Sequence, residues 1–112
     1  MQKDDLVRMR HMLDAAKHAV SFVEGKSRAD LGRDNMLAFA LVRAFEVIGE
    51  AASKISQDTR HRFSDIAWPK IVGMRNRLIH GYDDINLDIL WETTTIALPP
   101  LIRTLERIIG SE

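Results

Sequence analysis

DNMLAFALVRAFEVIGEAASKI, residues 34–55, has the periodicity of a helix that is buried along much of its surface. Its apolar residues recur at alternating spacings of four and three, at Leu37, Leu41, Ala44, Ile48, Ala51 and Ile55. Met36, Ala40 and Val47 widen this apolar arc, which predicts a central helix that contacts several neighbours. Asp34 is a suitable N-cap, because its carboxylate can accept a hydrogen bond from the first turn.

The segments on both sides of this helix continue the helical pattern. Over residues 4–24 the apolar positions form one stripe, which predicts an amphipathic helix: Leu6, Met9, Leu13, Ala16, Val20 and Val23. Gly25 and the run GKSRADLGRD end this helix. Residues 56–67 predict a polar connection with room for one short helical turn.

A third helix is predicted over residues 68–79, with Pro69 in the first turn, where its missing N–H costs nothing. The run HGYDDIN breaks it, and Asn86 can cap a fourth helix. The Pro99–Pro100 pair should kink or interrupt that helix. Its apolar stripe consists of Leu87, Leu90, Thr94, Ala97, Leu101 and Ile108. No segment has β-alternation. The sequence predicts one all-α domain over residues 1–112, an up-and-down four-helix bundle with a kinked last helix.

Charge and cysteine content exclude several classes of protein. The 112 residues include 16 Lys and Arg and 16 Asp and Glu, so the formal net charge is zero and any RNA contact must be local. The absence of cysteine excludes disulfides, thiolate metal sites and cysteine nucleophiles. The N-terminus lacks the apolar run of a signal peptide and no stretch approaches a membrane span, so a cytoplasmic protein is expected.

The strongest candidate site lies in IVGMRNRLIHGYDD, where Arg75 precedes His80 by five positions and Tyr82 follows. In a continuous helix Arg75 and His80 would point about 140° apart, but Gly81 predicts a helix end that lets His80 turn back. A histidine there can move the proton of an RNA 2′-hydroxyl or of the leaving oxygen, while a guanidinium binds and stabilises the phosphate. The alternative is that His80 and Tyr82 cap the helix and Arg75 pairs with a carboxylate.

A second candidate is the face of the 34–55 helix opposite its apolar stripe, with Phe39, Val42, Arg43, Glu46 and Glu50. One interpretation is a solvated surface with ion pairs between Arg43 and Glu46 and between Glu50 and Lys54. The other is that this face packs on the third helix or on a second subunit, with a glutamate orienting Arg75. The residue pattern leaves both open.

Three weaker candidates favour ordinary structural roles. His11, Asp14 and His18 have a spacing that could bind a metal, but a solvated face opposite the apolar stripe is expected, and no metal site. The run Arg60–Arg62 could touch phosphate, although a solvated loop is favoured. Trp68 and Trp91 are expected to anchor the core or an interface.

Three stretches in this order resemble the HepT-like branch of the HEPN superfamily: EVIGEAASKIS (46–56), WPKIVGMRNRLIHGYDDIN (68–86) and LWETTTIALPPLI (90–102). The resemblance implies a homodimer in which two Arg-x4–6-His motifs share a cleft. It also implies a metal-independent endoribonuclease without a cofactor, which acts as the toxin of a type II/VII-like toxin–antitoxin module.

Within this motif, the resemblance assigns proton transfer to His80, phosphate binding to Arg75 and positioning to Asn76. The implied partner is a minimal nucleotidyltransferase antitoxin that neutralises the toxin by adding AMP to Tyr82. Because the net charge is zero, the RNA would enter a narrow basic cleft to which both copies of Arg75 and Arg77 contribute, and no DNA substrate is expected. A rival interpretation is a non-catalytic HEPN dimer that serves as a nucleotide-, RNA- or protein-binding scaffold.

Overall fold

The computed structural model describes residues 1–81 and 84–112, with His80 and Gly81 described by their backbone alone. Its elements, in chain order, are α1 (Lys3–Phe22), α2 (Arg28–Arg33), α3 (Asn35–Ser53), α4 (Gln57–Arg62), α5 (Trp68–Val72), α6 (Met74–Leu78), β1 (Ile79–Gly81), β2 (Asp84–Ile85), α7 (Leu87–Glu92), the π-helix η1 (Thr93–Ala97) and α8 (Leu98–Gly110).

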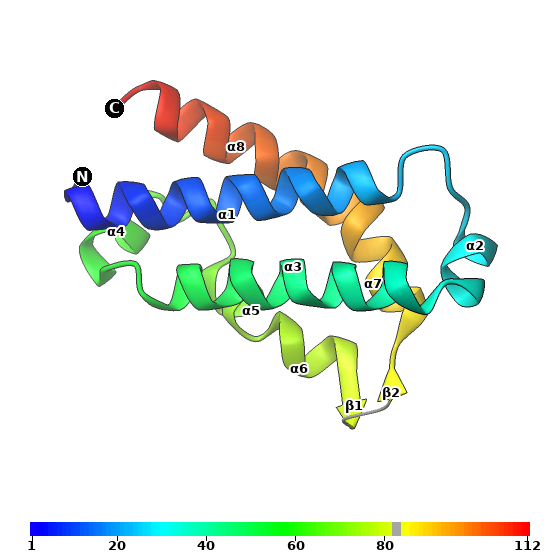
Figure 1. The fold of residues 1–112 in the computed structure, drawn as a ribbon. Helices are drawn as coiled ribbons and strands as arrows, with labels where there is room; N and C mark the ends of the chain where they lie inside the picture. Colours follow the sequence, from blue (N-terminus) through cyan, green and yellow to red (C-terminus); the bar gives the residue numbers. More distant parts are fainter. Residues whose placement is uncertain (82–83) are drawn as a thin grey trace.

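The long helix α3 lies at the centre of an all-α fold, between α1 on one side and α5 and α6 on the other (Figure 1). The predicted apolar stripe is confirmed, because all six of its positions are buried, although the last of them, Ile55, lies two residues beyond the end of α3. Helix α8 packs along α1, so both chain ends lie at the same end of the bundle (Figure 1). None of the helices in the described residues has the length and apolar character needed to cross a membrane.

Two predicted caps fix the starts of α3 and α7. The Asp34 carboxylate accepts a hydrogen bond of 3.1 Å from the Leu37 N–H, and the Asn86 side chain accepts one of 3.1 Å from the Ile89 N–H. Helix α2, by contrast, lies in the run that was expected only to end the first helix. There Ser27 and Asp30 form a capping box, in which each side chain accepts a hydrogen bond from the backbone N–H of the other.

The predicted third helix is divided at Gly73 into α5 and α6, and it ends at Leu78. The chain then becomes extended, since Ile79 has φ −118° and ψ 117°, and Ile79 pairs with Ile85 in a short antiparallel ladder. The Asn86 N–H donates to the Leu78 carbonyl at 2.7 Å and closes the base of this hairpin. The sequence contains no alternation over these few residues, so it does not predict the strands, whereas it does predict a helix end near His80.

The predicted interruption of the last helix is the π-helix η1, which ends one residue before the two prolines. Neither Pro99 nor Pro100 has an N–H, and each ring crowds a carbonyl one turn earlier. The hydroxyls of three consecutive threonines, residues 93–95, donate to the carbonyls four residues before them at 2.6–2.8 Å. The wider turn shifts the buried face from the predicted Ala97, which is exposed, to Leu98, which is 1% exposed.

Two further predictions of burial were wrong in detail. Met36 is 81% exposed and does not belong to the core arc of α3. The core face of α1 is centred on Met9, Met12, Ala16 and Ala19 rather than on the leucines, and Leu13 and Val20 are only partly buried. The periodicity of the sequence predicts an apolar stripe, but the packing of α1 against α3 and α8 determines which residues of that stripe are fully buried.

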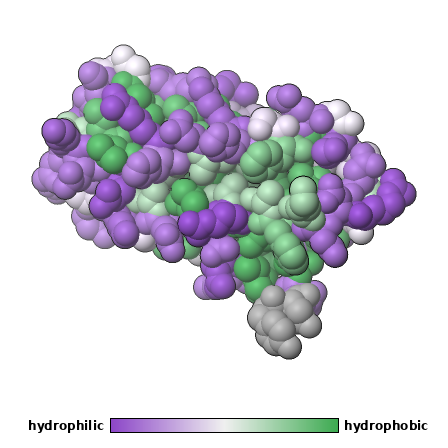
Figure 2. Space-filling view, viewed as in Figure 1, coloured by the Kyte–Doolittle hydropathy of each residue, from purple (hydrophilic) through white to green (hydrophobic). Residues whose placement is uncertain are grey.

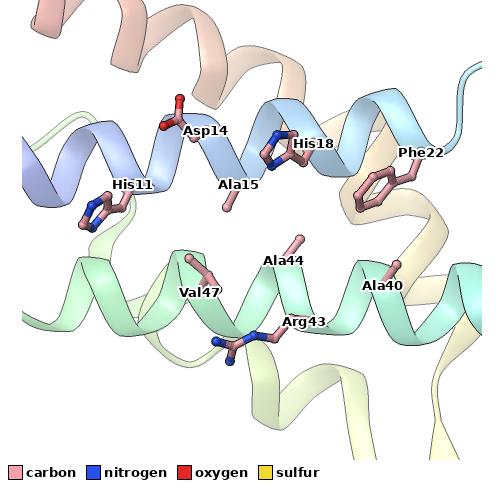
Figure 3. A pocket seen from close by; sticks show the side chains of 9 residues that line it. All are labelled: His11, Asp14, Ala15, His18, Phe22, Ala40, Arg43, Ala44 and Val47. Atoms are coloured by element: carbon pink, nitrogen blue, oxygen red, sulfur yellow. The ribbon is translucent and has the colours of Figure 1, made fainter.

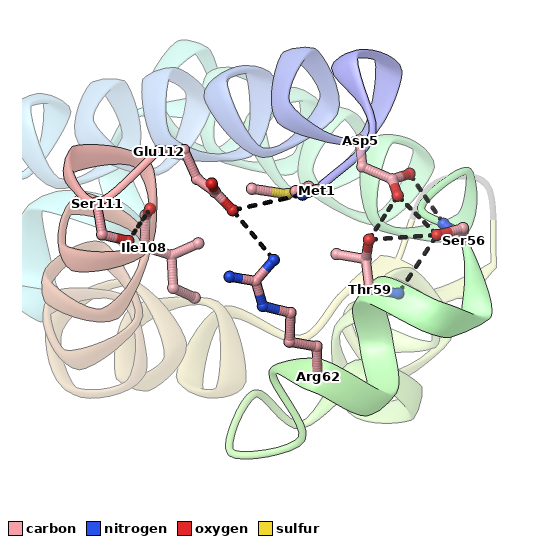
Figure 4. A network of polar contacts seen from close by, with 8 residues as sticks. All are labelled: Met1, Asp5, Ser56, Thr59, Arg62, Ile108, Ser111 and Glu112. Atoms are coloured by element: carbon pink, nitrogen blue, oxygen red, sulfur yellow. Dashed lines mark hydrogen bonds and ion pairs between the residues drawn. The ribbon is translucent and has the colours of Figure 1, made fainter.

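A buried carboxylate joins the start of α1 to the start of α4 (Figure 4). Asp5, which is 3% exposed, accepts hydrogen bonds from the Ser56 N–H at 3.0 Å, the Ser56 hydroxyl at 2.6 Å and the Thr59 hydroxyl at 2.6 Å. Burial opposes the charge of this carboxylate, but the hydrogen bonds from Ser56 and Thr59 outweigh it, so the pKa of Asp5 lies below its ordinary value.

The replacement Asp5→Asn is expected to lower the free energy of unfolding at pH 7 by about 1.5–3 kcal/mol, because an amide cannot accept all three bonds. A carboxyl with a lowered pKa stabilises the fold above its unfolded-state pKa of about 3.9 and loses this effect as the pH falls further. Denaturant titrations at pH 7 and pH 3 should therefore show a smaller difference for the variant than for the wild type. The exposed neighbour Asp4 gives the control Asp4→Asn; equal pH effects in both variants would contradict the prediction.

Candidate active site

Arg75 lies on α6 beside a glutamate of α3. The Arg75 Nε is 3.9 Å from Glu46 Oε2, with the arginine side chain 59% exposed and the glutamate 32% exposed. Helix α5, which leads into α6, packs closely on α3 at Gly49, where a Cβ would lie in van der Waals contact, 3.4 Å from the Ile71 carbonyl oxygen. At this distance Glu46 restrains the guanidinium without occupying all of its donors, so Arg75 can still bind an anion.

A groove of about 470 Å³ separates α3 from α5 and α6, and Arg75 forms part of its wall. The other lining residues are Phe45, Glu46, Gly49, Glu50, Ser53 and Val72. Thus the structure brings Arg75 together with both candidate glutamates, Glu46 and Glu50. Gly49, Ser53 and Val72 are part of this groove and were not singled out in the sequence, where nothing but their helical register could have indicated it.

The other two polar residues of α6 have surroundings that differ from those of Arg75. Asn76 is exposed, and its backbone N–H donates to the Gly73 carbonyl at 3.1 Å. Arg77 lines a different groove of about 450 Å³, between α5 and the η1–α8 segment. Within one chain, therefore, Arg77 does not contribute to the groove that contains Arg75.

The two remaining motif residues follow α6 directly. The backbone of His80 lies in β1, two residues beyond the end of α6 and five beyond Arg75. Tyr82 lies outside the described residues. Arg75 and the backbone of His80 are thus positioned by one short helix and the strand that begins where it ends.

The outer face of α3 lacks the ion pairs that one interpretation required. Within the described residues, Arg43 forms no salt bridge with Glu46, and Glu50 forms none with Lys54, whereas Glu46 contacts Arg75. Val42 on this face is 9% exposed and belongs to the core, so this part of the face is packed and not solvated. Phe39, in contrast, is 66% exposed. Apolar surface gathers in the middle of the view in front of α3 and continues towards the hairpin (Figure 2).

The candidate metal-binding residues of α1 lie along a third cleft, of about 430 Å³, between α1 and α3 (Figure 3). His11, Asp14 and His18 are exposed, and the His18 ring stacks on Phe22 with a centroid distance of 6.3 Å. The cleft also contains Arg43, which places this residue away from the Arg75 groove. Among the described residues, no cluster of three or more His, Cys, Asp or Glu side chains is suited to hold a metal ion.

The Arg60–Arg62 run is part of helix α4 and not the solvated loop that the sequence favours. The Arg60 guanidinium donates to the Ala52 carbonyl at 2.9 Å and to the Ile55 carbonyl at 3.2 Å, so it caps the end of α3. Arg62 pairs with Glu112 at 3.4 Å. These contacts give the arginines structural partners.

The two tryptophans belong to the core or its edge. Trp68 is 4% exposed in the core, and Trp91 is partly buried against the core.

The fold and the candidate site together define a class: a small helical domain in which an arginine and a histidine follow each other across a helix end. The model of the family described as Ribonuclease HepT-like matches residues 12–108. The chain belongs to this HepT-like ribonuclease family.

Curated relatives cover nearly the whole chain. "Putative RNase TTE0752" of Caldanaerobacter subterraneus is 35% identical over 104 residues, which are 93% of this chain and 93% of the relative. "Putative RNase MJ1380" of Methanocaldococcus jannaschii is 32% identical over 85% of this chain and 87% of the relative. "Probable ribonuclease HepT" of Thermococcus cleftensis is 31% identical over 86% of this chain and 91% of the relative. No solved structure matches the chain.

Proposed function

We propose that this protein is a metal-independent endoribonuclease and the toxin of a toxin–antitoxin module, with Arg75, Asn76 and His80 as its active-site residues. The observation that carries the proposal is the placement of Arg75, held beside Glu46 at the edge of a groove, on the short helix that leads into the strand with His80. The family match over residues 12–108 supports RNA as the substrate.

The proposed reaction is attack of the neighbouring 2′-oxygen on the phosphorus of the scissile phosphodiester, which gives a 2′,3′-cyclic phosphate. His80 accepts the proton of the 2′-hydroxyl, the 2′-oxygen forms a bond to phosphorus, and the bond to the 5′-oxygen breaks. The leaving 5′-oxygen takes up a proton, which a second imidazolium can supply. Arg75 neutralises the charge that grows on the phosphate oxygens. Asn76 is exposed on the same helix and would orient the phosphate through its amide.

A homodimer fits this chemistry because one chain supplies one His80, while the reaction uses an acid and a base. A dimer would bring two copies of Arg75 and His80 into one cleft and sum their positive charge locally, in a protein without net charge. The exposed apolar surface in front of α3 lies on the same face as the Arg75 groove and favours burial of this face between subunits (Figure 2).

The regulatory part of the proposal is a nucleotidyltransferase antitoxin that adds AMP to Tyr82. The modification would add bulk and negative charge two residues from His80, which opposes the entry of a phosphate. The replacement Tyr82→Phe is therefore expected to leave RNA cleavage within about twofold of the wild type and to abolish neutralisation. Growth of cells that express the toxin with the nucleotidyltransferase is the measurement; restored growth with the Tyr82→Phe toxin would contradict the proposed modification site.

Cleavage of RNA by the purified protein, with a metal chelator present, tests the central claim. Wild type should cleave, and His80→Ala should lose cleavage by about 100-fold or more while it keeps its fold and assembly. Unchanged cleavage by His80→Ala would remove His80 from the mechanism. If correctly folded wild type neither cleaves RNA nor arrests growth, the non-catalytic scaffold is the better description.

A further inference from the structure

We infer that two copies of this chain pack α3 against α3 in an antiparallel register, with Arg43 of each copy opposite Glu50 of the other. This inference rests on the homodimer in the proposed function and specifies its interface. It identifies the surface, the relative direction of the subunits and the charged pair that fixes both.

The outer ridge of α3 carries the residues for such a contact. Arg43 and Glu50 are seven positions apart, so at about 100° per residue they lie within roughly 20° of the same line along the helix, about 10 Å apart. Met36, 81% exposed, and Phe39, 66% exposed, lie on this ridge towards its N-terminal end. Both charged side chains are exposed, and within the described residues neither takes part in a salt bridge.

The charges choose between the two directions in which a helix can pack on its own copy. In a parallel arrangement each residue faces itself, so Arg43 meets Arg43 and Glu50 meets Glu50. In an antiparallel arrangement centred between Glu46 and Val47, Arg43 meets Glu50 twice. Two attractive contacts replace two repulsive ones, and like charges placed opposite each other at an interface are costly.

The antiparallel register also places the exposed Phe39 side chain of one copy against the Arg75 groove of the other. Phe39 of one copy lies at the level of Ser53 and Lys54 of the other, on the α5 and α6 side of the ridge, whereas Lys54 itself lines a groove on the α1 side. That position is the Ser53–Val72 end of the Arg75 groove, where Val72 is 38% exposed. An exposed aromatic ring therefore meets an open groove with apolar surface, and a two-fold axis makes the contact twice.

This register decides how the two active sites are placed. The two-fold axis passes close to Glu46, which contacts Arg75, and it keeps α6 of one copy on the same side as α6 of the other. The two Arg75 side chains then flank one cleft. A parallel packing would instead place α6 of each copy against α1 of the other and separate them.

Charge reversal tests the register directly. Arg43→Glu and Glu50→Arg, each alone, should raise the dimer dissociation constant by on the order of 100-fold. An equal mixture of the two variants should associate again as a heterodimer, because opposite charges then face each other at both contacts, and the double variant should regain the homodimer. Arg103→Glu, at an exposed position of α8, is the matched control and should remain dimeric.

Sedimentation of the separate and mixed variants gives the result without reference to activity. Single variants that remain dimeric, or a mixture that stays monomeric while circular dichroism shows folded chains, would overturn the inference. RNA cleavage is measured separately on the same samples. A wild type that dimerises in this register but never cleaves RNA refutes the proposed function alone, and a cleaving dimer that is insensitive to both reversals refutes the register alone.

Discussion

Replacing Arg75 by lysine is expected to lower the rate of RNA cleavage by roughly 100-fold, although the positive charge is kept. A guanidinium offers several donors in one plane, so it can contact Glu46 through one edge and bind two phosphate oxygens through another. An ammonium has no such planar fork, and at this position it would be drawn to the Glu46 carboxylate, 3.9 Å from the arginine Nε in the wild type.

The matched control for this experiment is Arg77→Lys on the same helix. Arg77 lines the other groove, so its replacement should change the single-turnover rate by less than about threefold if the chemistry depends on the Arg75 groove. Equal losses in both variants would indicate that α6 binds RNA through its charge in general. A fully active Arg75→Lys protein would show that the phosphate is not held at two points.

Replacing Phe45 by alanine is expected to lower the free energy of unfolding by about 3–5 kcal/mol. Phe45 is 1% exposed on the central helix, and it forms part of both the core and the floor of the Arg75 groove. The loss is a large part of the typical 5–15 kcal/mol for a domain, so a lower melting temperature and a smaller soluble yield should accompany it.

Ile96→Ala provides the comparison, because Ile96 is 69% exposed and its truncation should cost less than about 0.5 kcal/mol. Denaturant titrations of all variants should use a single protein concentration, since association stabilises the folded chain by mass action. A Phe45→Ala protein as stable as Ile96→Ala would mean that the centre of the bundle closes over the cavity.

The sequence predicted those parts of the fold that depend on neighbouring residues. The Asp34 and Asn86 caps and the buried stripe of α3 follow from local chemistry and periodicity, and the structure confirms them. Helix α2 is only one and a half turns long, so its periodicity is too short to detect, although the Ser27–Asp30 capping box could have indicated it. The exposure of Met36 depends on what packs beside α3, which no local pattern contains.

The candidate site could be nominated from sequence only in part. The spacing on α3 and the motif on α6 singled out Glu46 and Arg75, which the structure places in contact. The sequence did not show that Arg77 and Arg43 lie away from Glu46 and Arg75, because the direction of a side chain depends on how the helices cross. The division of the third helix at Gly73 and the extended backbone at Ile79 set that direction for α6, and the backbone at Ile79 depends on its pairing with Ile85 in the hairpin.

We expect the π-turn at residues 93–97 to let the last helix tolerate a change of one residue in its length. A π-turn contains about one more residue than the corresponding α-turn, and the helices on either side keep their own phase. Loss of one residue here would convert the turn to regular α-helix and leave both flanking faces directed as before. A single-residue deletion elsewhere in a buried helix would rotate everything after it by about 100°. Length variation among related chains therefore has a place inside this helix, where it would ordinarily be confined to loops.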